Sequence, residues 1–353
     1  MNSRPAAILT ALAAAALFGA ATPLAKSLLG SMSPFLVAGL FYLGSGLGLG
    51  LGIAARRVRR PRAQPPNEHR IQKAEWPWLL GAILAGGVAG PALLMLGLTS
   101  TPAATSALLL NLEAVMTAVI AWVVFRENVD SQLLLGMIAI VAGGVLLSWR
   151  PGQMAIPVGA LMIFGACLCW AIDNNLTRKV SANDAMVIAC LKGLIAGPVN
   201  LAIAFATGAA LPSLGAAGAA MLTGLAGYGI SLVLFVIALR HLGTARTGAY
   251  FSVAPLFGVA LSFVLWPELP SMTFWIAAAL MAFGVWLHVR ERHEHAHTHD
   301  RLEHTHRHRH DAHHQHTHDF PYEGDEPHTH AHVHLPITHS HAHFPDIHHR
   351  HRH

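Results

Sequence analysis

The feature that most limits how this chain can fold is a series of apolar blocks, each about twenty residues long. A helix of that length crosses the hydrocarbon core of a bilayer, and short segments rich in Pro, Gly or charged residues separate the blocks. We therefore predict an all-α integral membrane protein with ten transmembrane helices. The predicted helices cover residues 5–29, 34–54, 76–98, 102–125, 131–149, 156–178, 184–208, 216–240, 244–266 and 271–289.

The positions of Lys and Arg predict the orientation of these helices. The loop after the second block is the most basic, and alternation places most other basic loop residues on its side of the membrane. Because short cytoplasmic loops carry an excess of Lys and Arg, we expect both termini in the cytoplasm and the protein in the inner membrane. The same rule accounts for the net charge of +5, so we do not expect nucleic-acid binding.

Two halves of the chain resemble each other in order and pattern. Residues 98–128 align with residues 239–269, and a Glu closes the apolar run in each, Glu127 and Glu268. Five helices in each half would force the halves into opposite orientations. An inverted repeat of this kind is typical of secondary transporters, whose site lies near the midplane between the halves.

Three motifs give a family resemblance. PLAK at 23–26, NLEAVMTAVIAWVVFRE at 111–127 and APLFGVALSFVLWPE at 254–268 resemble the EamA family of the drug/metabolite transporter superfamily. The resemblance implies two five-helix repeats, residues 1–149 and 150–290. It also implies export or exchange of small metabolites, amino acids or toxic compounds, often driven by an ion gradient. The sequence departs from a strict repeat where Glu113 and Ala114 stand opposite Ala254 and Pro255.

Glu113 is a carboxylate well inside an apolar run. A charge at the bilayer centre costs at least ~2.5–3.5 kcal/mol, so such residues normally face an interior or a watery cavity. Ser106, Glu113 and Thr117 share one helix face by their spacing, and we expect them to line a central cavity. Two alternatives stay open: a protonated Glu, or a structural pair with a Lys. Proton coupling through Glu113 is also left open.

Other polar groups interrupt the apolar blocks. Asp173, Lys192 and Lys26 allow pairing of an acid with a base, but the sequence does not choose the pairs. Lys26 and Asp173 lie near helix ends, where their charged groups can equally well reach the interface. The predicted substrate-binding residues are Ser106, Glu113, Thr117, Lys192, Tyr228, Asp173 and Lys26.

The composition changes abruptly at the start of residues 291–353. This tail holds 23 of the 26 histidines, mostly with the spacing His-x-His. So polar a segment cannot bury a core, and we predict a disordered tail. Imidazoles suit Zn, Ni, Co or Cu, so we expect divalent metal binding there and no other cofactor. The predicted ligands are His293, His295, His297, His299, His304, His306, His308, His310, His328, His330, His332 and His334.

The function predicted from the sequence is secondary active transport of a small metabolite, amino acid or toxic organic compound, with a metal-binding regulatory tail. One alternative is an exporter of Ni, Co or Zn that is supplied by the tail. Another is a metal-responsive membrane sensor without transport. An enzyme is not expected, because no nucleophile with its base is recognisable in the sequence. Formation of a homodimer is left open.

Overall fold

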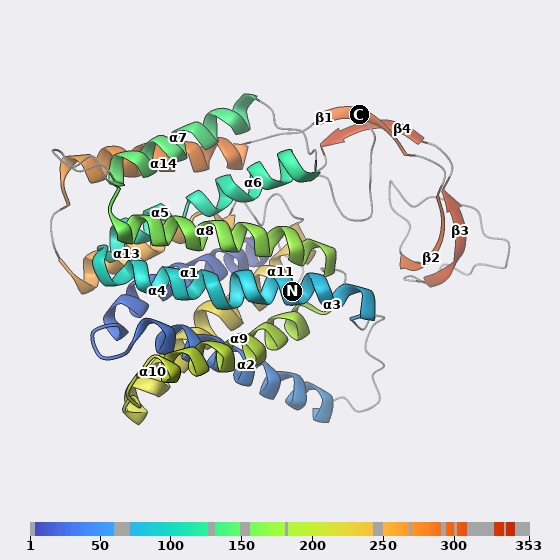
Figure 1. Ribbon diagram of the computed structural model, residues 1–353. Coiled ribbons are helices and arrows are strands. Elements are labelled where there is room, and N and C mark those ends of the chain that lie inside the picture. Colours follow the sequence, from blue (N-terminus) through green and yellow to red (C-terminus); the bar gives the residue numbers. More distant parts are fainter. Residues whose placement is uncertain are drawn as a thin grey trace. The chain divides into compact units, whose positions relative to one another are not determined.

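The structure, a computed structural model, consists of two compact units, Met1–Glu291 and Arg292–His353 (Figure 1). We call them the membrane unit and the tail unit. The described residues are 4–59, 71–125, 131–148, 156–180, 183–242, 250–267, 270–290, 294–299, 302–308, 328–334 and 337–342.

The first half of the membrane unit is helical throughout its described residues. Its elements are α1 (Arg4–Leu28), α2 (Pro34–Arg59), η1 (Lys73–Glu75), α3 (Trp76–Ala82), η2 (Ile83–Ala89), α4 (Gly90–Ser100), α5 (Ala103–Leu109), α6 (Leu112–Phe125) and α7 (Ser131–Ser148). Most of them fill the first five predicted blocks.

The second half has a similar series. Its elements are α8 (Val158–Thr177), η3 (Arg178–Val180), α9 (Ala185–Ala206), α10 (Leu214–Gly224), η4 (Leu225–Ile230), α11 (Ser231–Leu242), α13 (Ala254–Leu265) and α14 (Met272–Arg290). Helix therefore occurs in every one of the ten predicted apolar blocks.

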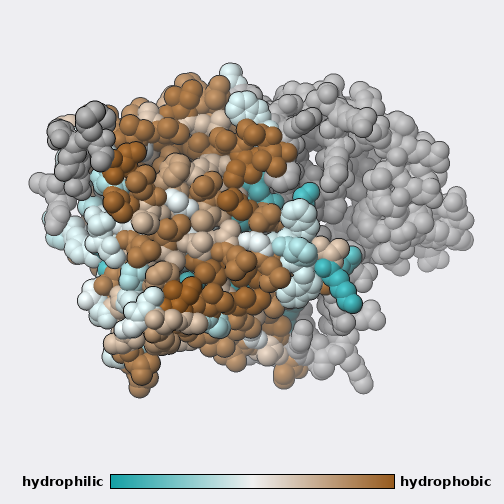
Figure 2. Space-filling view, viewed as in Figure 1, coloured by the Kyte–Doolittle hydropathy of each residue, from teal (hydrophilic) through white to brown (hydrophobic). Residues whose placement is uncertain are grey.

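Within the described residues, eight helical stretches are long and apolar enough to cross a membrane, and two shorter apolar helices, Ala254–Leu265 and Met272–Leu287, follow them. Apolar side chains cover most of the described surface on the face shown in Figure 2. Trp122 and Val123 of α6 and Leu135 and Ile138 of α7 are among the large apolar residues left exposed. In water such a surface would be unfavourable. This is the construction of a multi-pass membrane protein.

Helices from the two halves pack against each other over much of their length. α2 lies along α9 and α7 lies along α14, while α1 contacts α11 and α13, and α8 contacts α4 and α6. Small residues allow the closest approach: a Cβ atom on Gly46 of α2 would lie 2.6 Å from the backbone of Leu194 in α9. Close backbone contact through glycine is a common way to pack membrane helices.

Four of the helical stretches contain irregular backbone. η2 and η4 are single π-helical segments within longer helices. α5 and α6 are separated by a turn at Leu110 and Asn111, and a turn at Ser252 and Val253 precedes α13. These interruptions leave room for side chains to reach backbone groups in the middle of the membrane unit.

The tail unit contains four strands: β1 (Glu294–His299), β2 (Leu302–His308), β3 (His328–His334) and β4 (Ile337–Ala342). β1 pairs with β4 and β2 with β3, both antiparallel. The register places His297 opposite His339 and His306 opposite His330. These four segments are short, and the disorder of the tail without a ligand stays a prediction. Their alternation of His with residues such as Thr and Ala has the two-residue period of a strand.

Candidate functional site

Glu113 lies in the first turn of α6, directly after the turn that separates α6 from α5. Its side chain is half-buried, and its Oε1 accepts a hydrogen bond of 2.9 Å from Nδ2 of Asn174 in α8. The same Nδ2 lies 3.4 Å from Oγ1 of Thr117. A carboxylate in the first turn of a helix is stabilised by the helix dipole. The interruption between α5 and α6 thus gives Glu113 a favourable position deep in an apolar run.

Asn174 is exposed on a different face of α8 from several of that helix's large exposed apolar residues. Leu161, Leu168 and Ile172 mark the face of α8 that is exposed to lipid. At about 100° per residue, Asn174 points about 200° away from Ile172. Asn174 is nevertheless exposed. Its exposed amide group is the one that donates to Glu113, so the polar contact lies at an accessible point of α8.

Asp173 is paired with Lys192 of α9. Their Oδ1 and Nζ atoms are 2.5 Å apart, and the two side chains are 11% and 13% exposed. Thr177 joins them, since its hydroxyl donates to Asp173 at 2.8 Å and accepts from Lys192 at 2.9 Å. The structure thereby selects one of the acid–base pairs that the sequence left open.

The backbone of η2 is the point at which several helices meet. The carbonyl oxygen of Gly86 accepts hydrogen bonds from Oη of Tyr42 at 2.7 Å and from Nε1 of Trp170 at 2.9 Å. Nδ2 of Asn200 donates to the carbonyl oxygen of Gly87 at 3.0 Å. A side chain at Gly86 would overlap the carboxylate of Asp173. Single π-helical segments are frequent at functional sites, and this one ties α2, α8 and α9 together.

A group of aromatic rings lies close to these polar residues. The ring of Tyr228 in η4 lies within 6.1 Å, between centroids, of Phe18, Phe41 and Tyr42. Tyr42 and Tyr228 both interact electrostatically with Glu113. Residues from both halves of the chain therefore meet at these rings.

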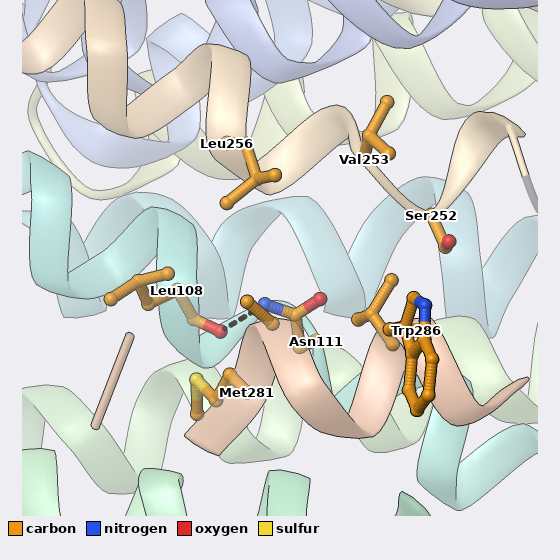
Figure 3. Close-up of a pocket in the computed structure, with 9 residues that line it drawn as sticks. Leu108, Asn111, Ser252, Val253, Leu256, Met281 and Trp286 are labelled. Atoms are coloured by element: carbon orange, nitrogen blue, oxygen red, sulfur yellow. Dashed lines mark hydrogen bonds between the residues drawn. The ribbon is translucent and has the colours of Figure 1, made fainter. Parts of the chain in front are cut away.

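A pocket of about 220 Å³ lies where the interruption between α5 and α6 faces the start of α13 and the side of α14 (Figure 3). Nδ2 of Asn111 donates to the carbonyl oxygen of Leu108 at 3.0 Å, as the dashed line in Figure 3 marks. Most of the lining is apolar, and it consists of Leu108, Asn111, Ser252, Val253, Leu256, Met281, Ala282, Val285 and Trp286. The pocket thus joins the two interrupted regions of the halves.

The structure brings some of the predicted site residues together and leaves others apart. Glu113 and Thr117 share Asn174, and Asp173 binds Lys192. Ser106, in contrast, is fully buried, and its hydroxyl donates to the carbonyl oxygen of Pro102 in its own helix. Lys26 donates to the carbonyl oxygens of Leu98 and Thr99 at the end of α4, away from the other predicted residues.

The predicted metal ligands are only partly within the described residues. His293 and His310 lie outside them, as do Glu127 and Glu268 of the family motif. The other ten predicted histidines lie on β1, β2 and β3. In the parts of the chain that the structure describes, no group of three or more His, Cys, Asp or Glu residues is placed to hold a metal ion.

Sequence reasoning missed the contributions of Asn174, Tyr42 and Trp170. Two adjacent asparagines in the sixth apolar block were a signal for the first of these. Tyr42 and Trp170 both donate to the backbone carbonyl oxygen of Gly86 in η2. The only sequence signal for this contact was the small-residue run AGGVAG at 85–90. Such a run predicts close packing but does not identify the side chains that will use it.

Two transporters of known sequence are similar to this chain. It is 27% identical over 282 residues to an uncharacterized transporter of Methanothermobacter thermautotrophicus, covering 76% of this chain and 82% of that protein. It is 25% identical over 189 residues to the uncharacterized transporter YyaM of Bacillus subtilis, covering 49% of this chain and 60% of that protein. These relatives indicate a transporter rather than an enzyme.

A solved crystal structure shares the fold, with a TM-score of 0.59 and 21% sequence identity over 81% of this chain and 96% of that one. At this identity the likeness concerns the fold alone. The sequence pattern that defines the EamA-like transporter family matches residues 5–149 and 157–290, which make up most of the membrane unit. The protein is thus a membrane transporter by family, and the chain belongs to the EamA-like transporter family.

Proposed function

We propose that this protein is a secondary active transporter that exports or exchanges a small metabolite, amino acid or toxic organic compound along a path beside Glu113. The observation that carries the proposal is a carboxylate within an apolar helix that follows an interruption of the backbone and accepts a hydrogen bond from the exposed Asn174. Secondary transporters bind their cargo near the midplane at discontinuous helices. Glu113, Thr117 and Asn174 form the polar part of this binding site.

The positions of the irregular backbone support two equivalent halves. In the alignment that pairs 98–128 with 239–269, Ala85 and Gly86 of η2 fall on Ala226 and Gly227 of η4. The same alignment pairs Asn111, in the turn between α5 and α6, with Ser252, in the turn before α13. Two helices in each half are thus irregular at corresponding places. This supports an inverted repeat of five plus five spans, with both termini in the cytoplasm.

The packing of the helices supports the same arrangement. If α1 corresponds to α8, the contacts of α1 with α11 and α13 have counterparts in those of α8 with α4 and α6. The α2–α9 and α7–α14 contacts each join a helix to its own counterpart. Rocking of two such halves around a fixed site would expose Glu113 to each side in turn. A carboxylate at this site is also the group through which a proton gradient would drive transport.

The substitution Glu113→Gln tests the proposal. Gln retains an acceptor for Asn174 but removes the charge, so we expect an intact fold and at least a 100-fold loss of flux. Flux would be measured in proteoliposomes with a panel of labelled amino acids, amines and drugs. Glu75→Gln makes the same change at η1, where Oε1 of Glu75 accepts from Asn183, and serves as the matched control with normal flux. Unchanged flux in Glu113→Gln would show that Glu113 is structural.

The histidine-rich tail favours a second candidate, a divalent metal exporter. Its 23 histidines would hold several late first-row cations, and a tail of this kind could supply them to the membrane unit. The same vesicles, loaded with zinc, nickel or cobalt, separate the two candidates. Metal flux without organic flux would replace the first proposal. A sensor without transport would move nothing in either series.

A further inference from the structure

Five aromatic rings meet near the proposed cargo site, and they come from several helices. Tyr228 of η4 lies 6.1 Å from Phe18 of α1, 5.6 Å from Phe41 of α2 and 5.4 Å from Tyr42 of α2, between ring centroids. Phe251, just before the turn that precedes α13, lies 5.4 Å from Phe18. We call these five residues the aromatic group.

The aromatic group faces the interior of the bundle. On α2, Leu47 and Leu51 mark the lipid-exposed face, and Tyr42 points about 140° and 180° away from them. On α1, Phe18 points about 180° away from the exposed Leu9. Tyr42 and Phe18 are nevertheless half-exposed. Their free surface therefore lies on faces of α1 and α2 that are turned away from these exposed leucines.

The charges beside these rings do not cancel. Glu113 interacts electrostatically with Tyr228 and Tyr42, and Asp173 interacts with Tyr42. Asp173 is neutralised by Lys192 at 2.5 Å. For the Glu113 side chain, the described residues offer one hydrogen-bond donor, the neutral Asn174. Within the described part of the chain, no basic side chain forms a contact with Glu113, so an ionised Glu113 carries a negative charge without a fixed counterion there.

Resting on the proposed transport function, we infer that the cargo is an organic cation with an apolar or aromatic body. The cationic group would offset the charge of Glu113, which is costly to leave alone in a membrane. The partly exposed rings of the aromatic group would contact the rest of the molecule through ring stacking and cation–π attraction, while the fully buried Phe41 packs behind Tyr228. Tyr228 occupies the centre, because it is the ring that contacts three others.

The same geometry disfavours anions and zwitterions. A cargo carboxylate would need a free cation, but Lys192 is already held by Asp173 and Thr177. Lys26 is held by backbone carbonyl oxygens at the end of α4. A carboxylate placed beside Glu113 would therefore meet a like charge, and neither of these two lysines is free to bind it. Among the possible cargoes, the site would therefore bind amines better than amino acids.

Three small molecules with the same phenyl body test the inference. Phenethylamine is a cation, phenylalanine a zwitterion and 3-phenylpropionate an anion at pH 7. Binding to the purified full chain in nanodiscs would be measured by calorimetry, with tetraphenylphosphonium as a second cation of larger body. We expect at least one of the two cations to bind ~10-fold or more tightly than phenylalanine and 3-phenylpropionate. Glu113→Gln should remove this preference.

Variants of the central ring test the role of the aromatic group. Tyr228→Leu should weaken cation binding ~10-fold, and Tyr228→Phe, which keeps the ring, should bind at least threefold more tightly than Tyr228→Leu. Phe263→Leu removes a ring that contacts Phe274 and Trp275 instead, so cation binding should be unchanged.

Several results would overturn the inference. One is that phenylalanine or 3-phenylpropionate binds as tightly as both cations or more tightly. Another is that neither cation binds. A third is equal weakening by Phe263→Leu and Tyr228→Leu, which would trace the loss to the fold. Flux of an amino acid in the vesicle panel would leave the transport proposal intact while this inference fails. Binding of a cation without flux of any compound would overturn the transport proposal alone.

Discussion

Asp173 and Lys192 bind each other inside the helix bundle, with Thr177 completing the contact. Replacing only the acid by Asp173→Asn would leave the ammonium group of Lys192 buried without a counter-charge. Removing one partner of a buried pair typically costs ~3–5 kcal/mol, so we expect a loss of that size in the free energy of unfolding. Unfolding of the purified protein in mixed micelles would measure the loss.

Two controls sharpen this prediction. The double variant Asp173→Asn with Lys192→Met removes both charges and should recover much of the lost stability. Asp184→Asn removes a charge from the pair with Arg56, 3.2 Å apart, in which the Arg56 side chain is 55% exposed, and keeps a residue that can cap α9. That variant should cost less than ~1 kcal/mol. Equal losses in Asp173→Asn and Asp184→Asn would contradict a buried structural pair.

At the scale of single residues, the sequence reveals which groups are unusual but not how they are paired. Glu113, Asp173 and Lys192 could be picked out because each is costly within an apolar block. Their partners lie on other helices, so no spacing along the chain predicts them. Ser106 shows the opposite error: its helical spacing placed it with Glu113, but its hydroxyl binds its own backbone instead.

The π-helical segment η2 gives a prediction at the scale of elements. A methyl group at Gly86 would overlap the carboxylate of Asp173 and disturb the carbonyl oxygen that Tyr42 and Trp170 share. Overpacking of this kind costs ~1–3 kcal/mol, so Gly86→Ala should lower the free energy of unfolding by that amount. It should also reduce flux strongly, since the Asp173–Lys192 pair would have to move.

Gly218 of α10 provides the matched comparison for Gly86. A Cβ atom there would have no atom within 4 Å beyond its immediate surroundings, so alanine fits. Because alanine favours helix over glycine by up to ~1 kcal/mol, Gly218→Ala should leave stability unchanged or raise it. If Gly86→Ala were as harmless as Gly218→Ala, η2 would not be the meeting point that we describe.

The sequence predicts the helical blocks well because hydropathy over twenty residues is set by the bilayer and not by neighbours in the fold. Helix occupies each predicted block. The turns inside the fourth and ninth blocks and the segments η2 and η4 were not predicted, because they depend on which helices press against them. In the tail, the composition predicts disorder whereas the His-x-His alternation suits a strand, so the sequence alone does not choose between them.

At the scale of the whole molecule, the tail unit is separate from the membrane unit. Its histidines alternate along β1 to β4, and the register sets His295 opposite His341 and His304 opposite His332. Neutral imidazoles bind late first-row cations, and metal binding must displace protons from them. Binding should therefore be strong at pH 7.5 and weaken as the pH falls below about 6.5, where histidines take up protons.

Deletion of residues 292–353 tests whether the tail unit binds the metal while the membrane unit carries out transport. The membrane unit has its own core, including Phe41, Met95 and Ile163, so its unfolding midpoint should change by less than ~2 °C. Zinc and nickel binding measured by calorimetry at pH 7.5 should be lost, and flux of an organic cargo should persist. A variant with a Gly/Ser-rich tail of equal length separates the loss of histidine from the loss of chain. If the truncated protein still binds zinc with the original stoichiometry, the metal sites lie in the membrane unit, and a metal cargo becomes the better explanation of the protein.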